Sequence, residues 1–363
     1  MVRVRHLRAV TAAFAATTVL LLAACGAPAS APTTESGSSS TSEPRTVRVV
    51  THDSFALSEG LVAAFEESTG ITVEFIPAGD AGEVVNRAVL SSGNPEADVL
   101  FGIDTTLLSR AIEAEVFEPY SSSTEALRPE LRDAGLGVVT PVDDGDVCVN
   151  IDDAWFADRG IPAPAGLEDL ADPRYRGLLV VQNPATSSPG LAFLLATIAR
   201  YGDAWPGYWE RLRANDVAVV NGWSEAYLSE FTAGGGGGDR PLVVSYSTSP
   251  PAEIVYAEEP KPDRPSTSVM LDGCYRQVEF AGVLRGTQDA ASARAVVDWL
   301  VSPEVQADVP LSMFVFPARD GVPLPEVFER FVTRPAEPLE LSAEEIAAQR
   351  DEWIEQWTQL VLR

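Results

Sequence analysis

The chain has 363 residues, of which 45% are hydrophobic and 22% are charged, and its formal net charge is −27. This length and composition suit a globular protein with enough core for two domains. The acidic balance argues against a nucleic-acid partner, because phosphate binding needs basic patches, and it favours a small cation as ligand.

The first residues have the pattern of an export signal. Three arginines within the first eight residues precede an apolar run over 9–22. That run is shorter than the roughly 20 residues of a membrane-spanning helix. It ends in LAACG, residues 22–26, which resembles the lipobox of bacterial lipoproteins. The alternative is a plain apolar signal with a chance cysteine.

We therefore expect a lipoprotein signal peptide over 1–24 and lipidation of Cys25. Residues 25–45 are rich in Ser, Thr, Pro and Ala and contain almost no large apolar side chain, which predicts a flexible tether. The expected location is extracytoplasmic, with a lipid anchor in the cell membrane.

From residue 46 the sequence alternates between strand and helix patterns. Runs of β-branched residues predict strands, and apolar residues at helical spacing predict helices. The expected elements are strands over 46–51, 71–78 and 97–103 and helices over 57–70, 81–93 and 105–117. This alternation predicts an α/β fold with a parallel sheet covered on both faces.

The alternation continues through the second half of the chain. We expect extended chain over 138–152, strands over 177–184, 217–222, 241–250 and 273–284, and helices over 188–202, 223–234, 288–309 and 342–362. Five glycines, 234–238, lack P-loop spacing and predict a solvated loop. Ser342 and Glu345 form a capping box at the start of the last helix, whose Trp353 and Trp357 are expected to pack inward.

Two cysteines remain if Cys25 carries lipid. An exported chain permits disulfides, so Cys148 and Cys274 are expected to form one bridge. Two buried free thiols are the alternative.

The stretch His52, Asp53 and Ser54 contains the three residue types of a hydrolase triad. Consecutive residues of a strand point to opposite faces, however, whereas a triad needs each group within hydrogen-bond reach of the next. The sequence also lacks a G-x-S-x-G elbow, and His52 is the only histidine after residue 24. We therefore expect no catalytic residues, and a surface hydrolase is a remote alternative.

Several separated segments resemble the thiamine-binding substrate-binding proteins of bacterial ABC importers. That family carries YDSF, RTSTPG, GWSEAY and SYTTSP, and this chain has HDSF at 52–55, ATSSPG at 185–190, GWSEAY at 222–227 and SYSTSP at 245–250. The resemblance extends over essentially the whole chain from Val47 onward.

The resemblance implies a periplasmic-binding-protein fold of type II, with two α/β lobes joined by a hinge that the chain crosses twice. Lobe one is expected over 46–144 plus 272–363 and lobe two over 145–271. Cys148 and Cys274 would then lie close to the two crossings.

The resemblance also implies a monomeric receptor that captures thiamine or its phosphates and delivers the ligand to an ABC permease and its ATPase, without a cofactor or metal. Thiamine needs aromatic faces for its rings, a carboxylate near its thiazolium cation, and donors for its hydroxyethyl arm. The matching positions give as ligand-binding residues His52, Asp53, Ser54, Asp80, Ala81, Asp104, Ser187, Ser188, Trp223, Tyr246, Ser247, Thr248, Ser249 and Phe314.

Several of these residues also have a purely structural interpretation. Trp223 could pack a loop, and Asp80 or Asp104 could cap the following helix. Ser187 and Ser188 precede Pro189 and an apolar helix, so they could cap that helix, bind an anion at its N-terminus, or do both.

Three aromatic positions of the family differ in this chain. His52 and Ala252 stand where the family has tyrosine, and Phe314 stands where it has tryptophan. The expected aromatic cage is thinner as a result, which favours a related ligand such as a pyrimidine precursor of thiamine or a thiamine phosphate. Another organic cation, such as a polyamine, is the alternative ligand. Iron is disfavoured because no paired tyrosines or His/Glu cluster stand out.

Overall fold

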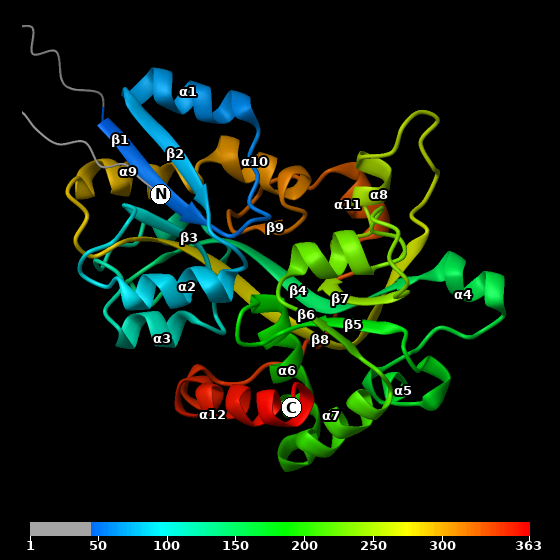
Figure 1. Ribbon diagram of the computed structural model, residues 1–363. Coiled ribbons are helices and arrows are strands. Elements are labelled where there is room, and N and C mark those ends of the chain that lie inside the picture. The colour runs from blue at the N-terminus through cyan, green and yellow to red at the C-terminus, as the bar shows by residue number, and fades with distance from the viewer. Residues whose placement is uncertain (1–44) are drawn as a thin grey trace, which may run out of the picture. The chain divides into compact units, whose positions relative to one another are not determined.

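The computed structural model describes residues 45–363. The predicted signal peptide, Cys25 and all of the predicted tether except Arg45 fall outside this described part. The described residues belong to one compact unit built around a mixed sheet with helices packed on it (Figure 1). Within residues 45–363, no helix is both long and apolar enough to cross a bilayer.

The strands of the described residues agree closely with the expected ones, except that the two-residue β9 was not expected. They are β1 (Arg45–Thr51), β2 (Ile71–Pro77), β3 (Val99–Asp104), β4 (Thr140–Asp152), β5 (Leu179–Gln182), β6 (Ala218–Val220), β7 (Leu242–Tyr246), β8 (Thr267–Val283) and β9 (Phe316–Pro317). β1 starts inside the predicted tether, at Arg45, and β8 starts six residues earlier than expected.

The α-helices of the described residues are α1 (Glu59–Thr69), α2 (Ala81–Leu90), α3 (Leu108–Glu113), α4 (Asp153–Arg159), α5 (Leu167–Leu170), α6 (Ser188–Tyr201), α7 (Trp205–Ala214), α8 (Ala252–Val255), α9 (Ala290–Leu300), α10 (Pro303–Ser312), α11 (Glu326–Phe331) and α12 (Ala343–Val361). The single helix expected over 288–309 is wrong, because α9 ends before Ser302 and Pro303, which cap and start α10. The helix expected over 223–234 is a short π-helix, η5 (Glu225–Glu230).

The strand order is β2-β1-β3-β8-β4-β7-β5-β6, with β9 paired to β4. β1 pairs in parallel with β2 and β3, which confirms the parallel arrangement expected for the first segment. β8 runs antiparallel to both β3 and β4, however, so the whole sheet is mixed rather than parallel.

The two longest strands form an antiparallel ribbon whose register shifts between Pro141 and Asp143 and again between Val147 and Val149. β4 and β8 pair from Thr140 opposite Ala281 to Asp152 opposite Thr267. Both predicted lobe boundaries, 144/145 and 271/272, fall inside these strands, and the division into lobes stays a prediction. The sulfur atoms of Cys148 and Cys274 lie 2.05 Å apart across this ribbon.

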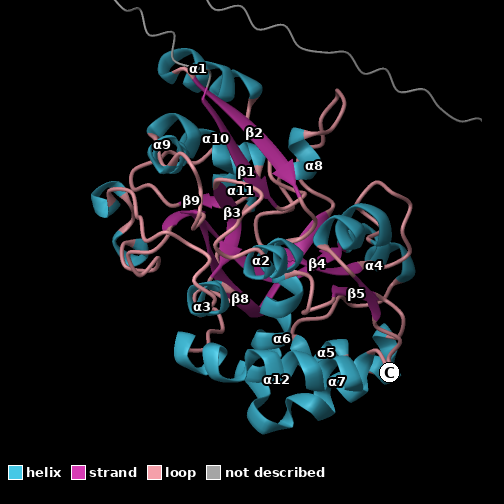
Figure 2. Cartoon of the chain, turned by 60° about the vertical axis from the view of Figure 1, so that its left-hand side comes forward, coloured by secondary structure: helices cyan, strands magenta, loops and turns pink. Residues whose placement is uncertain are grey.

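The C-terminal helix packs as its sequence predicts. The Ser342 and Glu345 capping box is present at the start of α12. Trp357 is fully buried and meets Trp209 of α7 edge to face, with ring centroids 5.4 Å apart. Figures 1 and 2 both show α12 lying alongside α7. Trp209 and Trp357 therefore stabilise the fold, and neither of them lines the cavity described next.

Candidate functional site

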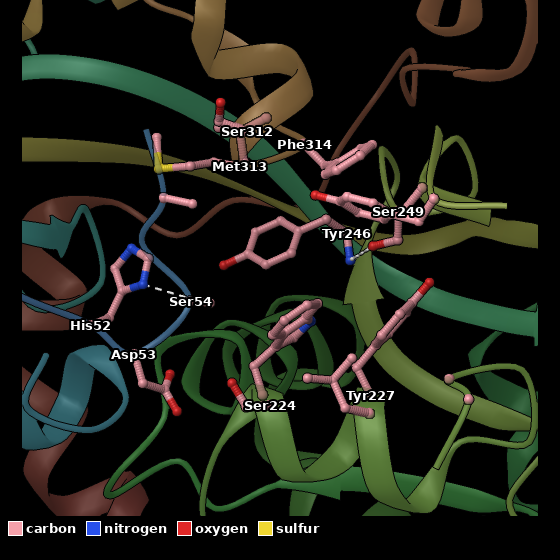
Figure 3. A pocket seen from close by; sticks show the side chains of 18 of the residues that line it. His52, Asp53, Ser54, Ser224, Tyr227, Tyr246, Ser249, Ser312, Met313 and Phe314 are labelled. Carbon is pink, nitrogen blue, oxygen red and sulfur yellow. Dashed lines mark hydrogen bonds between the residues drawn. The ribbon is translucent and has the colours of Figure 1, made fainter. Parts of the chain in front are cut away.

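A cavity of about 480 Å³ opens among segments that are far apart in the sequence (Figure 3). This volume is within the range of small-molecule sites. Its walls come from the loop after β1, from η5 and the glycine loop that follows, from the end of β7 and from α8, from β8, and from the loop after α10. The lining residues are His52, Asp53, Ser54, Ala56, Trp223, Ser224, Tyr227, Leu228, Ala233, Gly234, Gly235, Tyr246, Ser249, Ala252, Glu253, Tyr256, Glu279, Ser312, Met313, Phe314 and Val315.

His52 is fixed by aromatic neighbours and by a glycine. Its ring centroid lies 6.4 Å from that of Phe55 and 5.7 Å from that of Phe101. Gly102 has φ +101° and forms a bulge in β3, and a Cβ atom there would lie 2.5 Å from His52 Cδ2. Only glycine adopts this conformation readily and leaves room for the imidazole.

The imidazole of His52 has a polar neighbour at each nitrogen, and the neighbour at Nδ1 forms a hydrogen bond. Ser54 Oγ lies 2.9 Å from Nδ1, and Glu279 Oε1 lies 3.3 Å from Nε2. A hydrolase triad uses the opposite nitrogens, with serine on Nε2 and the carboxylate on Nδ1. Burial lowers the pKa of His52, although the surrounding carboxylates oppose this shift. The ring is therefore neutral near pH 7 and offers an uncharged face.

Glu279 is the carboxyl group of β8 that reaches the cavity. Burial raises its pKa to about 8, and a hydrogen bond from Asp143 of β4 opposes that rise. The same pairing, together with burial, raises the pKa of Asp143 well above its ordinary value. The pair consequently holds protons at neutral pH that two exposed carboxyl groups would have lost, and a cation in the cavity would favour their release.

Asp80 and Asp104 lie behind the cavity rather than on its wall. The Asp80 carboxylate accepts the backbone N–H groups of Ala81 at 2.7 Å, Ser188 at 3.1 Å and Trp223 at 2.8 Å. Asp104 accepts the Thr106 N–H at 2.5 Å and also the Ser188 hydroxyl. Burial raises the pKa of both carboxyl groups, and these donors oppose the rise. The helix-capping interpretation of Asp80 is thereby confirmed.

One wall of the cavity is aromatic. The rings of Trp223 and Tyr227 are nearly parallel, 14° apart with centroids separated by 5.0 Å. Trp223 Nε1 donates to Ser245 Oγ at 2.8 Å, which fixes the indole plane. Figure 3 shows Tyr246 and Phe314 facing the same space. Offset and parallel rings of this kind suit a flat aromatic or cationic ligand.

The π-helix of this wall depends on the five-glycine run. Cβ atoms at Gly234, Gly236 and Gly238 would lie between 1.7 and 2.1 Å from carbonyl oxygens of η5. The glycines form a loop that is exposed at residues 235–237, as expected for a solvated loop, and alternate glycines also pack directly against η5. Glycine is needed here for close approach of two backbone segments.

The family model described as bacterial extracellular solute-binding protein matches residues 94–334. The chain belongs to this family. Among the curated relatives of this solute-binding protein, a thiamine-binding periplasmic protein of Salmonella typhimurium is 32% identical over 324 residues, covering 87% of this chain and 93% of the relative. The thiamine-binding periplasmic protein of Escherichia coli K12 is 31% identical over the same length.

Solved structures give the same picture of this solute-binding protein. A periplasmic thiamin binding protein matches with a TM-score of 0.76 at 29% identity, covering 88% of this chain and 96% of that one. The similar structures are type II periplasmic binding proteins, which confirms the expected fold class.

The expected ligand-binding residues of this solute-binding protein divide into two sets. Those that line the cavity are His52, Asp53, Ser54, Trp223, Tyr246, Ser249 and Phe314. Those that lie outside its lining are Asp80, Ala81, Asp104, Ser187, Ser188, Ser247 and Thr248. Ser187 is the N-cap of α6, as its structural alternative predicts, and Thr248 donates its hydroxyl to the Phe314 carbonyl.

Sequence reasoning missed several residues of the cavity wall, chiefly Tyr227, Glu253, Tyr256, Glu279 and Met313. Tyr227 belongs to the GWSEAY segment and could have been found from it. Tyr256 meets Phe314 with ring centroids 5.6 Å apart, so the wall keeps an aromatic surface beside Ala252. Within the described residues, no group of three His, Cys, Asp or Glu side chains is arranged to hold a metal.

Proposed function

We propose that this protein is the extracytoplasmic receptor of an ABC importer and that its ligand is thiamine. The observation that carries the proposal is the cavity itself, which combines aromatic faces with a carboxyl group and has no basic side chain on its wall. The names of the relatives support the same ligand.

The chemistry of the wall matches the parts of thiamine. Trp223, Tyr227 and Tyr246 offer π-faces to the pyrimidine and to the cationic thiazolium, and such cation–π contacts contribute about 0.5–2 kcal/mol. Glu279 supplies the counter-charge once it releases its proton. The neutral His52 ring occupies the position of a family tyrosine without adding a positive charge.

The finer features of the receptor follow from its sequence. We propose that Cys25 carries the lipid anchor, that Cys148 and Cys274 form a disulfide, and that the protein acts as a monomer which passes its ligand to the permease and ATPase. Ligand binding would close the two proposed lobes about the β4–β8 ribbon, as in related binding proteins. Catalysis forms no part of this function.

Calorimetry of the soluble domain tests the proposal. Thiamine should bind with a Kd near or below about 1 µM, whereas spermidine and the free pyrimidine should bind more weakly. Spermidine binding tighter than thiamine would favour the polyamine alternative. Failure of every thiamine-class ligand to bind would show that the proposal is wrong.

The hydrolase alternative has its own test. Ser54→Ala removes the hydroxyl beside His52, so any ester or amide turnover that depends on this pair would disappear in the variant. We expect no turnover in either protein.

A further inference from the structure

We propose that Asn221 is a site of spontaneous deamidation, and that the product lengthens the backbone next to the aromatic wall of the cavity. The modification itself is independent of the ligand, whereas its effect on affinity rests on the proposed function.

Asn221 and Gly222 form the turn between β6 and η5. Asn221 is the only asparagine of the sequence that is followed by glycine. Glycine obstructs attack of its own backbone nitrogen on the preceding side chain least, because it has no Cβ. Asn221 is exposed, and none of the described residues forms a hydrogen bond with its side-chain amide or with the Gly222 N–H. The two reacting groups can therefore approach each other.

The hydroxyl of Thr186 lies where it favours the first step of this reaction. Removing the proton from the Gly222 nitrogen leaves an anion whose charge resides largely on the Asn221 carbonyl oxygen, because both atoms belong to the same amide. Thr186 Oγ1 donates to this oxygen at 2.7 Å. A donor that is already placed where negative charge develops stabilises that charge, as in an oxyanion hole. The turn therefore promotes attack by the Gly222 nitrogen.

The reaction consumes water and releases ammonia, without oxidation or reduction. The Gly222 nitrogen forms a bond to Asn221 Cγ, the bond from Cγ to Nδ2 breaks, and Nδ2 leaves as ammonia with the proton from the Gly222 N–H. Water then opens the succinimide ring at either carbonyl carbon. Opening at Cγ gives aspartate. Opening at the backbone carbonyl gives isoaspartate, in which the chain runs through the former side chain and is longer by a methylene group.

The longer backbone of isoaspartate would disturb contacts that fix the cavity wall. The Trp223 N–H donates to Asp80 Oδ2 at 2.8 Å, and the Gly222 carbonyl oxygen accepts the Ala226 N–H at 3.1 Å. These bonds hold the residues that follow the inserted methylene group, while the bond from Thr186 holds the residue before it. A longer connection between fixed points strains at least one of these bonds, so isoaspartate should displace the indole from the wall.

Peptide mapping by mass spectrometry tests the modification itself. Purified protein incubated at neutral pH in water enriched in heavy oxygen should convert Asn221 to isoaspartate and aspartate, with heavy oxygen incorporated in both. Asn215 is the internal control, because it is buried and its amide donates to the Leu170 and Asp172 carbonyl oxygens. Conversion of Asn221 no faster than that of Asn215 would overturn the proposal.

Two variants test the route. Gly222→Ala should fold, because its Cβ would meet Asp80 at 3.4 Å, an ordinary contact, and φ lies outside the left-handed region. Its methyl group obstructs ring closure. Thr186→Val removes the hydroxyl and keeps the shape of the side chain. Both should slow conversion of Asn221 by at least about threefold, with circular dichroism as a check of folding. An unchanged rate in Gly222→Ala would refute the succinimide route, and an unchanged rate in Thr186→Val would refute activation by the hydroxyl.

Calorimetry measures the consequence for binding. Aged protein that carries isoaspartate should bind thiamine at least about tenfold more weakly than fresh protein, as expected for loss of a hydrogen bond to a charged group. Asn221→Asp adds the same charge without lengthening the backbone and should bind like fresh wild-type protein. Equal affinity of fresh and aged protein would overturn the effect on the wall. Failure of fresh protein to bind thiamine would overturn the proposed function, while the mass measurement would still decide whether Asn221 deamidates.

Discussion

Replacing Glu279 by glutamine is expected to change how the stability of the protein depends on pH. The pKa of Glu279 is raised from 4.5 to about 8 by burial. Between these values the folded protein keeps a proton that the unfolded chain has lost, so the free energy of unfolding falls as pH rises. One such proton lowers the free energy of unfolding by about 1.4 kcal/mol for each pH unit of rise, or by about 3 kcal/mol between about pH 5.5 and pH 7.5.

Glutamine keeps the shape of the side chain and cannot titrate, so the variant should lose this part of the pH dependence. Burial also raises the pKa values of Asp80 and Asp104, and their contributions largely cancel when the variant is compared with the wild-type protein. Asp143 is paired with Glu279, which helps to raise its pKa, so the pKa of Asp143 should fall in the variant and add to the loss of pH dependence. The variant should be increasingly more stable than the wild type as pH rises, by about 3 kcal/mol over this range.

Urea denaturation at several pH values would measure this difference. Glu67→Gln, an exposed position on α1, provides the matched control and should follow the wild-type curve. Parallel curves for wild type and Glu279→Gln would refute the reasoning, because they would mean that Glu279 titrates alike in the folded and unfolded chains.

The same proton should be linked to ligand binding. If the thiazolium cation lies beside Glu279, binding must favour the ionised carboxylate, so affinity for thiamine should rise with pH up to about 8. Calorimetry in buffers of different ionisation enthalpy should show proton release on binding, and Glu279→Gln should abolish it. Proton uptake by the wild-type protein would contradict this placement of the ligand.

Three further predictions concern the wall and the ribbon. Trp223→Ala should weaken thiamine binding by ~10- to 30-fold in calorimetry, since it removes a cation–π face worth up to about 2 kcal/mol. Trp223→Phe keeps an aromatic ring and should weaken binding less. Equal affinity for the wild type and both variants would exclude stacking of the ligand on this indole. Gly234→Ala would place a Cβ 1.7 Å from the Tyr227 carbonyl and should lower both melting temperature and affinity, whereas Gly207→Ala in α7 meets nothing within 4 Å and should lower neither. Replacing Cys148 and Cys274 by alanine removes a cross-link between residues with a sequence separation of 126. In urea titrations the free energy of unfolding should fall by at most about 5 kcal/mol. Free thiols detected on the native wild-type protein would show that no bridge exists.

Features of the helices that depend only on neighbouring residues could be predicted from the sequence. The Ser342 and Glu345 capping box depends on neighbouring residues alone, and it is found in the structure. The break between α9 and α10 was equally local, at Ser302 and Pro303, but the apolar periodicity on both sides obscured it.

The site was harder to predict because it depends on contacts between distant segments. Glu279 is flanked in β8 by the buried residues Val278 and Phe280, and nothing in its local sequence shows that the carboxyl group faces the loop after β1. Asp80 follows a strand end, where ligand contacts are common, yet its three N–H partners come from three separate segments. The run of five glycines indicates only that small residues are needed at these positions. That the glycines pack against the backbone of η5 is seen only in the structure.

The proposed Cys148–Cys274 disulfide has a consequence for chain integrity. It closes a ring around residues 149–273, and the exposed glycines at 235–237 lie within that ring. A protease that cuts this loop would produce two polypeptides that remain covalently joined beside the β4–β8 ribbon. A receptor cut at this point would therefore keep its two pieces joined by the disulfide as well as by the pairing of β4 with β7 and β8.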